Sequence, residues 1–106
     1  MNRYIIVVAV LFSTLLPLGH AGELKYAVIP TDGFVPDAET AKKIAEAVWI
    51  PIYGKKVIDG EKPFKTKLKD GVWTVEGTLP AGDLGGVALV EIAKSDGRIL
   101  RVTHDQ

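Results

Sequence analysis

The sequence predicts an α+β domain in which one main N-terminal helix packs on a curved antiparallel meander of about four strands, after a signal peptide. Three features predict this fold: an apolar run near the N-terminus, one stretch with apolar residues at helical spacing, and two Asp-Gly dipeptides flanked by alternating residues. We expect a signal peptide at residues 1–21, a lead-in segment at 22–36 and a single domain at 37–106.

The first 21 residues have the parts of a secretory signal peptide. Arg3 supplies positive charge, residues 4–18 are apolar, and the Gly-His-Ala sequence that follows ends on a small residue. The apolar run is shorter than the about 20 residues that span a bilayer, and Pro17 suits a cleaved signal better than a continuing helix. We therefore expect cleavage after Ala21 and a periplasmic or secreted protein without a stable membrane anchor. An uncleaved anchor is the alternative.

Composition narrows the classes of partner. Loss of Arg3 with the signal peptide leaves 12 basic against 13 acidic side chains, so the mature chain has no global field that would attract nucleic acid or an anionic membrane. The chain has no cysteine, so disulfides cannot stabilise it as they do many small exported domains. A compact core or a bound partner must supply the stability.

The main helix is predicted over residues 37–53. Asp37 is a good N-cap, Gly54 is a natural residue after the last turn, and Pro51 should kink the helix near its end. Before the helix, residues 24–29 suggest a short strand, and after it residues 57–62 look irregular and polar. The apolar stripe consists of Ala41, Ile44, Ala45, Val48 and Ile52.

The first predicted hairpin turns at Asp70-Gly71. Pairing outward from this turn places Leu68 opposite Trp73, Thr66 opposite Val75, and Phe64 opposite Gly77, where the aromatic ring would cover the bare backbone. One face is then apolar, and the other carries polar side chains, as expected for half-buried antiparallel strands. The polar face comprises Lys65, Lys67, Lys69, Thr74, Glu76 and Thr78.

The second predicted hairpin turns at Asp96-Gly97. A two-residue loop would pair Val90 with Thr103, Ile92 with Arg101 and Lys94 with Ile99, and a bulged turn would shift this register. Neither face of this hairpin is cleanly polar, so either both faces are partly covered or one of them is a contact surface, through which a homodimer is possible.

The residues offer little for catalysis or metal binding, and we expect no catalytic, cofactor or metal site. His104 and Ser95 are the only histidine and serine after residue 21, and the predicted hairpin separates them by about 20 Å at ~3.3 Å per residue. Glu76 and Glu91 lie on separate strands and could approach, but Lys65 lies across from Glu76. The glycine-rich segment 82–86 leads into a strand rather than a helix, unlike a phosphate loop.

Protein binding remains the open possibility. The three lysines of residues 65–69 form either a solvated surface that prevents aggregation or a docking site for an acidic partner. Trp49, Tyr53 and Trp73 are either core residues or binding anchors. The candidate protein-binding residues are Lys65, Lys67, Lys69, Trp49 and Tyr53.

Several motifs together resemble one family. They are the helix end Ile-Pro-Ile-Tyr-Gly at 50–54, Lys-Pro-Phe at 62–64, Trp-Thr-Val-Glu-Gly-Thr-Leu-Pro at 73–80, Gly-Gly-Val at 85–87 and Ile-Ala-Lys-Ser-Asp-Gly-Arg-Ile-Leu at 92–100. This string, from about residue 38 to 104, resembles the bacterial immunity proteins assigned to the nuclear transport factor 2 (NTF2) fold. The resemblance implies a cystatin-like cone and a role in polymorphic toxin systems, in which the protein neutralises a toxin by binding it, without enzyme activity. The full NTF2 fold has further helices and strands, but this chain has room for only one main helix. A deep pocket is therefore not expected.

Three functions stay open at this stage. The first is an exported immunity protein, whose partner would be a toxin acting in the cell envelope. The second is a small periplasmic PepSY-like binding or peptidase-inhibitor module, because the segment 96–102 also resembles PepSY domains. The third, an enzyme on a cone-shaped fold, lacks a polar cluster to carry the reaction.

Overall fold

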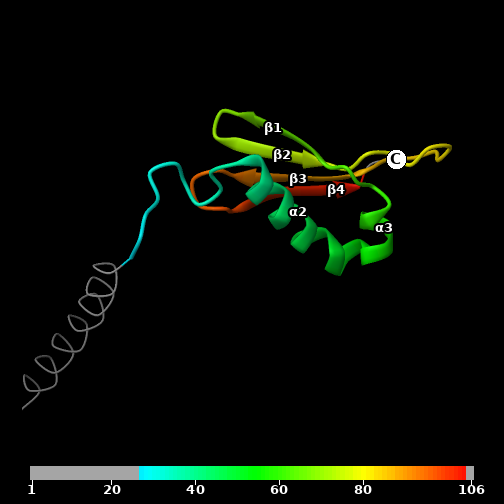
Figure 1. Cartoon of the computed structure of the whole chain (residues 1–106), viewed down its shortest axis with the longest axis horizontal. Helices are drawn as coiled ribbons and strands as arrows, with labels where there is room; N and C mark the ends of the chain where they lie inside the picture. The colour runs from blue at the N-terminus through cyan, green and yellow to red at the C-terminus, as the bar shows by residue number, and fades with distance from the viewer. Residues whose placement is uncertain (1–26, 105–106) are drawn as a thin grey trace, which may run out of the picture.

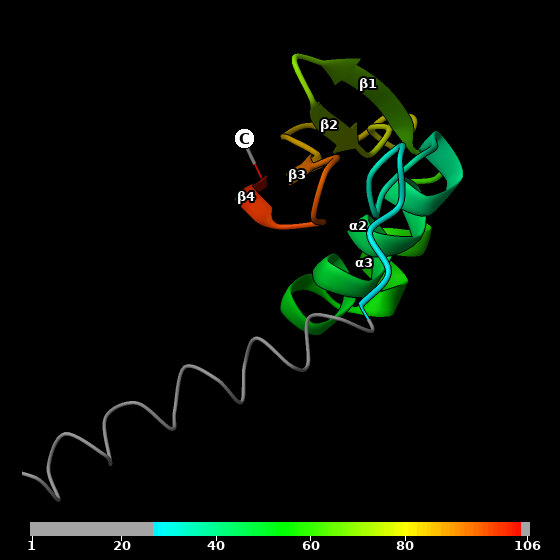
Figure 2. The same ribbon diagram turned by 90° about the vertical axis from the view of Figure 1, so that its left-hand side faces the viewer.

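A computed structural model describes residues 27–104 and shows one antiparallel sheet with two helices on one of its faces (Figures 1 and 2). The elements follow in the order α2 (Ala38–Tyr53), α3 (Lys55–Asp59), β1 (Lys65–Lys69), β2 (Val72–Glu76), β3 (Ala88–Ala93) and β4 (Ile99–His104). The strand order β1-β2-β3-β4 is a simple meander. The predicted fold class, one main helix on a four-stranded antiparallel meander, is confirmed. The predicted signal peptide lies outside the described residues.

Helix α2 begins and ends where the sequence indicates. The side chain of Asp37 accepts the backbone N–H of Thr40 at 2.8 Å and the Thr40 hydroxyl at 2.7 Å, which satisfies one of the free donors of the first turn. Gly54 ends the helix with a φ of 93°, a conformation that favours glycine. Pro51 lies inside the helix, which continues to Tyr53. In the described part of the chain, no helix is both long and apolar enough to cross a membrane.

The buried face of α2 differs from the predicted stripe. Ala41, Ala45 and Trp49 are fully buried, whereas Ile52 is 57% exposed. The two alanines let the helix approach the sheet closely, and the large Trp49 ring then fills the space beyond them, packing edge-to-face on Phe64 with ring centroids 5.1 Å apart. Burial of the largest side chain therefore sets the rotation of the helix.

Two further expectations for the helical half are wrong. Residues 57–62 were expected to be irregular, but residues 57–59 belong to the helix α3, because Ile58 is fully buried in the core and this burial outweighs the polar character of its neighbours. Residues 27–29, the described part of the expected strand 24–29, are exposed and have no strand structure.

The lead-in segment joins the sheet further along, at residues 33–35. The backbone N–H groups of Phe34 and Val35 donate to the carbonyls of Ser95 and Lys94, at 3.0 and 3.1 Å. Val35 is fully buried, and its carbonyl accepts the indole N–H of Trp73 at 2.8 Å. The core thus includes Val35, which precedes Asp37, the predicted first residue of the domain.

The register of the first hairpin is as predicted, with Leu68 paired to Trp73 and Thr66 to Val75. The predicted register of the second hairpin is wrong by one residue. Val90 pairs with Val102, and an irregularity between Glu91 and Ile92 widens the difference to two residues at the Ile92–Ile99 pair. The turn is longer than two residues, since the Ala93 carbonyl accepts the N–H of Gly97 and the Ala93 N–H donates to the carbonyl of Arg98.

The one-residue shift decides which side chains reach the core. Because successive residues point to opposite faces, it turns Val102 rather than Thr103 toward the helix, and Val102 packs against the core. The fully or largely buried apolar residues are Val35, Ala41, Ala45, Trp49, Ile58, Phe64, Trp73, Val75, Ala88, Val90, Ile92 and Ala93.

Candidate functional site

The face of the sheet opposite the helices is the first candidate surface. Among residues 27–104, no helix is packed across it (Figure 2). At the end of the face where Val72 and Ala93 lie, the lead-in residues 29–33 line a pocket together with them. The strand registers place on this open face Lys65, Lys67, Lys69, Val72, Thr74, Glu76, Leu89, Glu91, Ala93, Arg101 and Thr103. We call this set the open face.

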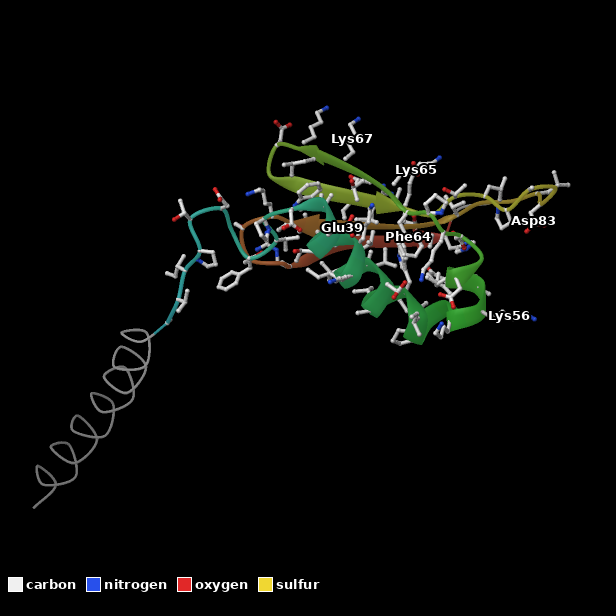
Figure 3. All side chains as sticks on the ribbon, viewed as in Figure 1. Glu39, Lys56, Phe64, Lys65, Lys67 and Asp83 are labelled. Carbon is white, nitrogen blue, oxygen red and sulfur yellow. The ribbon has the colours of Figure 1, made fainter. Side chains whose placement is uncertain are left out.

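The β1 lysines stand on the open face without a neutralising partner. Lys65, Lys67 and Lys69 are exposed, and none is in an ion pair with a described carboxylate. Figure 3 shows Lys65 and Lys67 pointing away from the helical layer. Glu76 is the cross-strand partner of Lys65 by register, yet the two side chains form no ion pair. The three lysines expected from the sequence therefore form a solvent-exposed strip along β1, which we call the lysine strip.

Several other charges of the domain are paired, unlike the three lysines of β1. Arg101 contacts Glu91 at 3.3 Å on the same face. Lys62 joins Glu46 of α2 at 3.0 Å and Asp59 of α3 at 3.2 Å. The hydrogen bonds that Lys62 donates to Glu46 and Asp59 raise the pKa of Lys62, and the hydrogen bonds that Asp59 accepts from Lys55 and Lys62 lower the pKa of Asp59. Lys62 thus ties the two helices together, whereas the β1 lysines hold nothing in place.

The two aromatic candidates do not join the lysines. Trp49 is fully buried, so a partner cannot reach it. Tyr53 is half-buried and packs against the ring of His104 with centroids 5.0 Å apart. Of the five candidate binding residues, the structure brings together only the three lysines.

A second polar feature was missed in the sequence analysis: a buried contact between Glu61 and His104. Glu61 is 3% exposed. One carboxylate oxygen accepts the backbone N–H of Ala88 at 2.7 Å, and the other lies 2.9 Å from Nε2 of His104. The Glu61 carbonyl accepts the N–H of Thr78 at 2.7 Å. One residue thereby connects the segment after α3 to the ends of β2, β3 and β4.

Gly77 makes room for this contact. A Cβ at Gly77 would collide with the Glu61 side chain, 2.8 Å from its Cβ, and the nearest atoms all belong to Glu61. The expectation that Phe64 covers the backbone at Gly77 is therefore wrong. An isolated glycine at the end of a strand marks a close approach by another group, so Gly77 was the one local signal for a buried neighbour, although it did not identify Glu61.

A groove lies beside this contact. It has a volume of about 620 Å³ and runs between α3 and the 80–86 loop. Glu61 and His104 form part of its floor, and Leu84, in the loop, is 99% exposed. Because both oxygens of Glu61 are already engaged within the protein, the carboxylate serves to hold the strand ends together.

Ser95 and His104, the nucleophile and base considered for catalysis, lie apart. Ser95 is in the turn between β3 and β4, and His104 is at the far end of β4, where it pairs with Ala88. Glu91 pairs with Thr74 and Glu76 with Leu89, so the two glutamates are diagonal neighbours on the open face, where Arg101 engages Glu91. Within residues 27–104 no group of three or more His, Cys, Asp or Glu side chains is placed to hold a metal ion.

A helix laid across a four-stranded antiparallel meander, with the other sheet face open, defines a small α+β protein of the NTF2-like class. Residues 40–106 match the family described as NTF2 fold immunity protein. This match covers more than half of the chain, so the protein belongs to the NTF2 fold immunity protein family.

Two relatives come from Escherichia coli strain K12. The chain is 35% identical to the uncharacterized protein YhhH over 86 residues, which are 80% of this chain and 65% of YhhH. It is 37% identical to the uncharacterized protein YbbC over 84 residues, which are 77% of this chain and 66% of YbbC. The chain thus spans just under two thirds of the length of these relatives. No solved structure is significantly similar to it.

Proposed function

We propose that this protein is an exported immunity protein that neutralises a cognate bacterial toxin by direct binding, without catalysis. The observation that carries the proposal is its membership of the immunity protein family over residues 40–106. That range runs from the first turn of α2 through β4 and so includes almost all of the folded domain.

The placement of polar groups supports binding rather than turnover. Glu61 and His104 are committed to each other and to backbone groups, and Ser95 lies at the opposite end of the β3–β4 hairpin from His104. A catalytic base must instead come within hydrogen-bond reach of a reacting group. The polar side chains of the open face are exposed or half-buried and spread over a surface, which suits contact with another protein.

Export is the second part of the proposal. Residues 1–21 have the charge, apolar core and small terminal residue of a signal peptide. An immunity protein must occupy the compartment in which its toxin acts, so the toxin acts in the cell envelope. Cleavage after Ala21 predicts that the protein recovered from the periplasm begins at Gly22, which N-terminal sequencing or intact mass measures directly.

A rescue experiment tests the function. Each gene next to this one is expressed in a bacterial host with a periplasmic export signal, alone and together with the full chain. We expect one neighbour to stop growth, the full chain to restore it, and the two purified proteins to form a stable complex of fixed stoichiometry. The matched control is the chain without residues 1–21, which should stay in the cytosol and fail to rescue.

Two results would contradict the proposal. Failure to neutralise any toxic neighbour would remove the immunity function. Inhibition of an envelope peptidase by the purified chain, in the absence of toxin rescue, would instead favour the PepSY-like binding module.

A further inference from the structure

The charge on the open face is uneven. Although the chain as a whole has equal numbers of basic and acidic side chains, the open face carries four basic groups against two acidic ones. Arg101 is neutralised by Glu91 at 3.3 Å, so the unpaired positive charge is concentrated along β1. A neutral domain with a positive strip presents a local field, and such fields select partners of opposite charge.

Protection of the sheet edge does not account for this strip. Lysines on an edge strand do discourage pairing with other chains, but both edges of this sheet need that protection. β4, the opposite edge strand, has Ile99 and Leu100 exposed at 39% and 43%, and its Arg101 is engaged with Glu91. The concentration of three lysines in the five residues of β1 is therefore a feature of one surface.

The surface beside the strip is low, with Val72 and Thr74 half-buried and Ala93 6% exposed. Across β2, the partners of Lys67 and Lys69 are Thr74 and Val72, and the next row contains Ala93. These side chains are short, so the long lysine side chains stand above them and can reach the carboxylates of a protein seated on the face. Lysine ammonium groups suit this contact, since each has three donors and flexible reach.

A second copy of this chain fits the face poorly. A two-fold interface brings the same patch of both subunits together, which would oppose two strips of unpaired lysines. Like charges across an interface disfavour association. An acidic protein surface, by contrast, has the opposite charge to the strip, which favours association.

We infer that the toxin binds through an acidic surface to the open face of the sheet, with Lys65, Lys67 and Lys69 as the principal contacts. This inference rests on the proposed function and adds the contact surface and the chemistry of the partner. The lysines guide the encounter and hold the complex, so its affinity falls as salt rises.

A pair of charge-matched variants tests the surface. Lys65→Glu/Lys67→Glu reverses two charges of the strip. Lys43→Glu/Lys56→Glu makes the same change of net charge at two exposed lysines of α2 and α3 that also lack a described ion pair. Both proteins are made as the full chain, purified from the periplasm and checked by thermal unfolding.

Binding to the toxin that the wild-type chain neutralises is measured from 50 to 500 mM salt. We expect the strip variant to bind at least about tenfold more weakly at low salt, with a flatter salt dependence, and the control to change by less than about threefold. Equal losses of affinity in both variants, or no loss in either, would overturn the inferred surface. The proposed function would still stand, because the wild-type chain neutralises the toxin in this experiment. Self-association of the wild type that the strip variant abolishes would assign the face to a second copy and overturn it also.

A partner-independent arm separates the two proposals. A deca-glutamate peptide is titrated into isotope-labelled wild-type protein at low salt, and amide shifts are followed by NMR. Shifts along β1 that the strip variant loses would support the acidic-partner surface even if no toxin is neutralised and the immunity function fails. Shifts confined to α2 and α3, or no shifts, would overturn it.

Discussion

The carboxylate of Glu61 lies 2.9 Å from Nε2 of His104 and is almost completely buried. Glu61 comes directly after α3, and His104 is the last residue of β4, so the contact joins two ends of the domain that are 43 residues apart in sequence. The same carboxylate accepts the N–H of Ala88 at 2.7 Å, where β3 begins. The base of the 78–87 loop is therefore fixed by one side chain.

Removal of the Glu61 carboxylate should destabilise the domain. Glu61→Ala leaves the Ala88 N–H and the His104 ring without their partner in a buried site, and we expect a loss of about 2–4 kcal/mol in the free energy of unfolding. Glu61→Gln keeps an oxygen for Ala88 and should cost about 1 kcal/mol. Urea denaturation measures both. Asp83→Ala, at an exposed position in the loop, is the control and should stay within about 0.5 kcal/mol of wild type.

Gly77→Ala tests the close approach of Glu61. The backbone at Gly77 does not have a positive φ, so any cost comes from the collision of the new Cβ with the Glu61 side chain. We expect a loss of about 2–3 kcal/mol in unfolding free energy. Glu61→Gly removes the whole side chain, including the Cβ that lies 2.8 Å from the new Cβ. In the double variant with Glu61→Gly the obstacle is gone, and the combined loss should be smaller than the sum of the two single losses by at least about 1 kcal/mol. Strict additivity would show that the two residues do not share this space.

The parts of the fold that were predicted correctly depend on neighbours in sequence. Asp37 caps a helix whose first turn follows it directly, and Asp70-Gly71 sets the pairing of the strands on either side. Their physical causes, a side-chain acceptor for free N–H groups and a tight turn, act within a few residues. The lysine strip could also be predicted, because its residues follow the two-residue period of one strand.

What was missed depends on contacts between distant segments. In the sequence Glu61 is an ordinary polar residue, because its partners Ala88 and His104 lie 27 and 43 residues away. Trp49 becomes a core residue through Phe64, which a helical period alone cannot show. The register of the second hairpin changed because its turn takes extra residues, and the Asp-Gly dipeptide does not fix the turn length.

The indole of Trp73 should anchor the lead-in segment through its hydrogen bond to the Val35 carbonyl. Trp73→Phe removes this bond, 2.8 Å long, together with part of the ring, and we expect a loss of about 2 kcal/mol. The amides of Phe34 and Val35, which bond the Ser95 and Lys94 carbonyls, should exchange with deuterium faster.

Trp49→Phe is the matched control for this change. Trp49 is fully buried, but its indole N–H has no hydrogen-bond partner in the described part of the chain. The substitution loses ring volume without losing a hydrogen bond, so exchange at residues 34 and 35 should stay as in the wild type. Faster exchange in both variants would mean that general loosening of the core, rather than the Trp73 bond, controls the lead-in.

Stability at low pH should depend on the cap of α2. The N–H of Thr40, and then its hydroxyl, hydrogen-bond the Asp37 carboxylate and lower its pKa below the usual 3.8. A carboxyl whose pKa is lower in the folded state adds stability above its unfolded pKa and loses it as the pH falls through the folded pKa. Unfolding followed in urea from pH 6 to pH 2 should therefore show a loss of stability below about pH 4.

Three variants separate the charge of the cap from its geometry. Asp37→Asn keeps an acceptor oxygen for the N–H of Thr40 but cannot titrate, so the fall in stability below pH 4 should be shallower than in the wild type. Asp37→Ala removes the acceptor and should lower the urea midpoint at neutral pH as well. Thr40→Val removes only the hydroxyl contribution and should give an intermediate pH dependence. Hydrogen bonds from Lys55 and Lys62 also lower the pKa of Asp59, and this carboxylate adds a similar dependence of stability on pH. Some loss of stability at low pH should therefore remain in all three variants. An unchanged profile in Asp37→Asn would show that the cap charge does not contribute to acid stability.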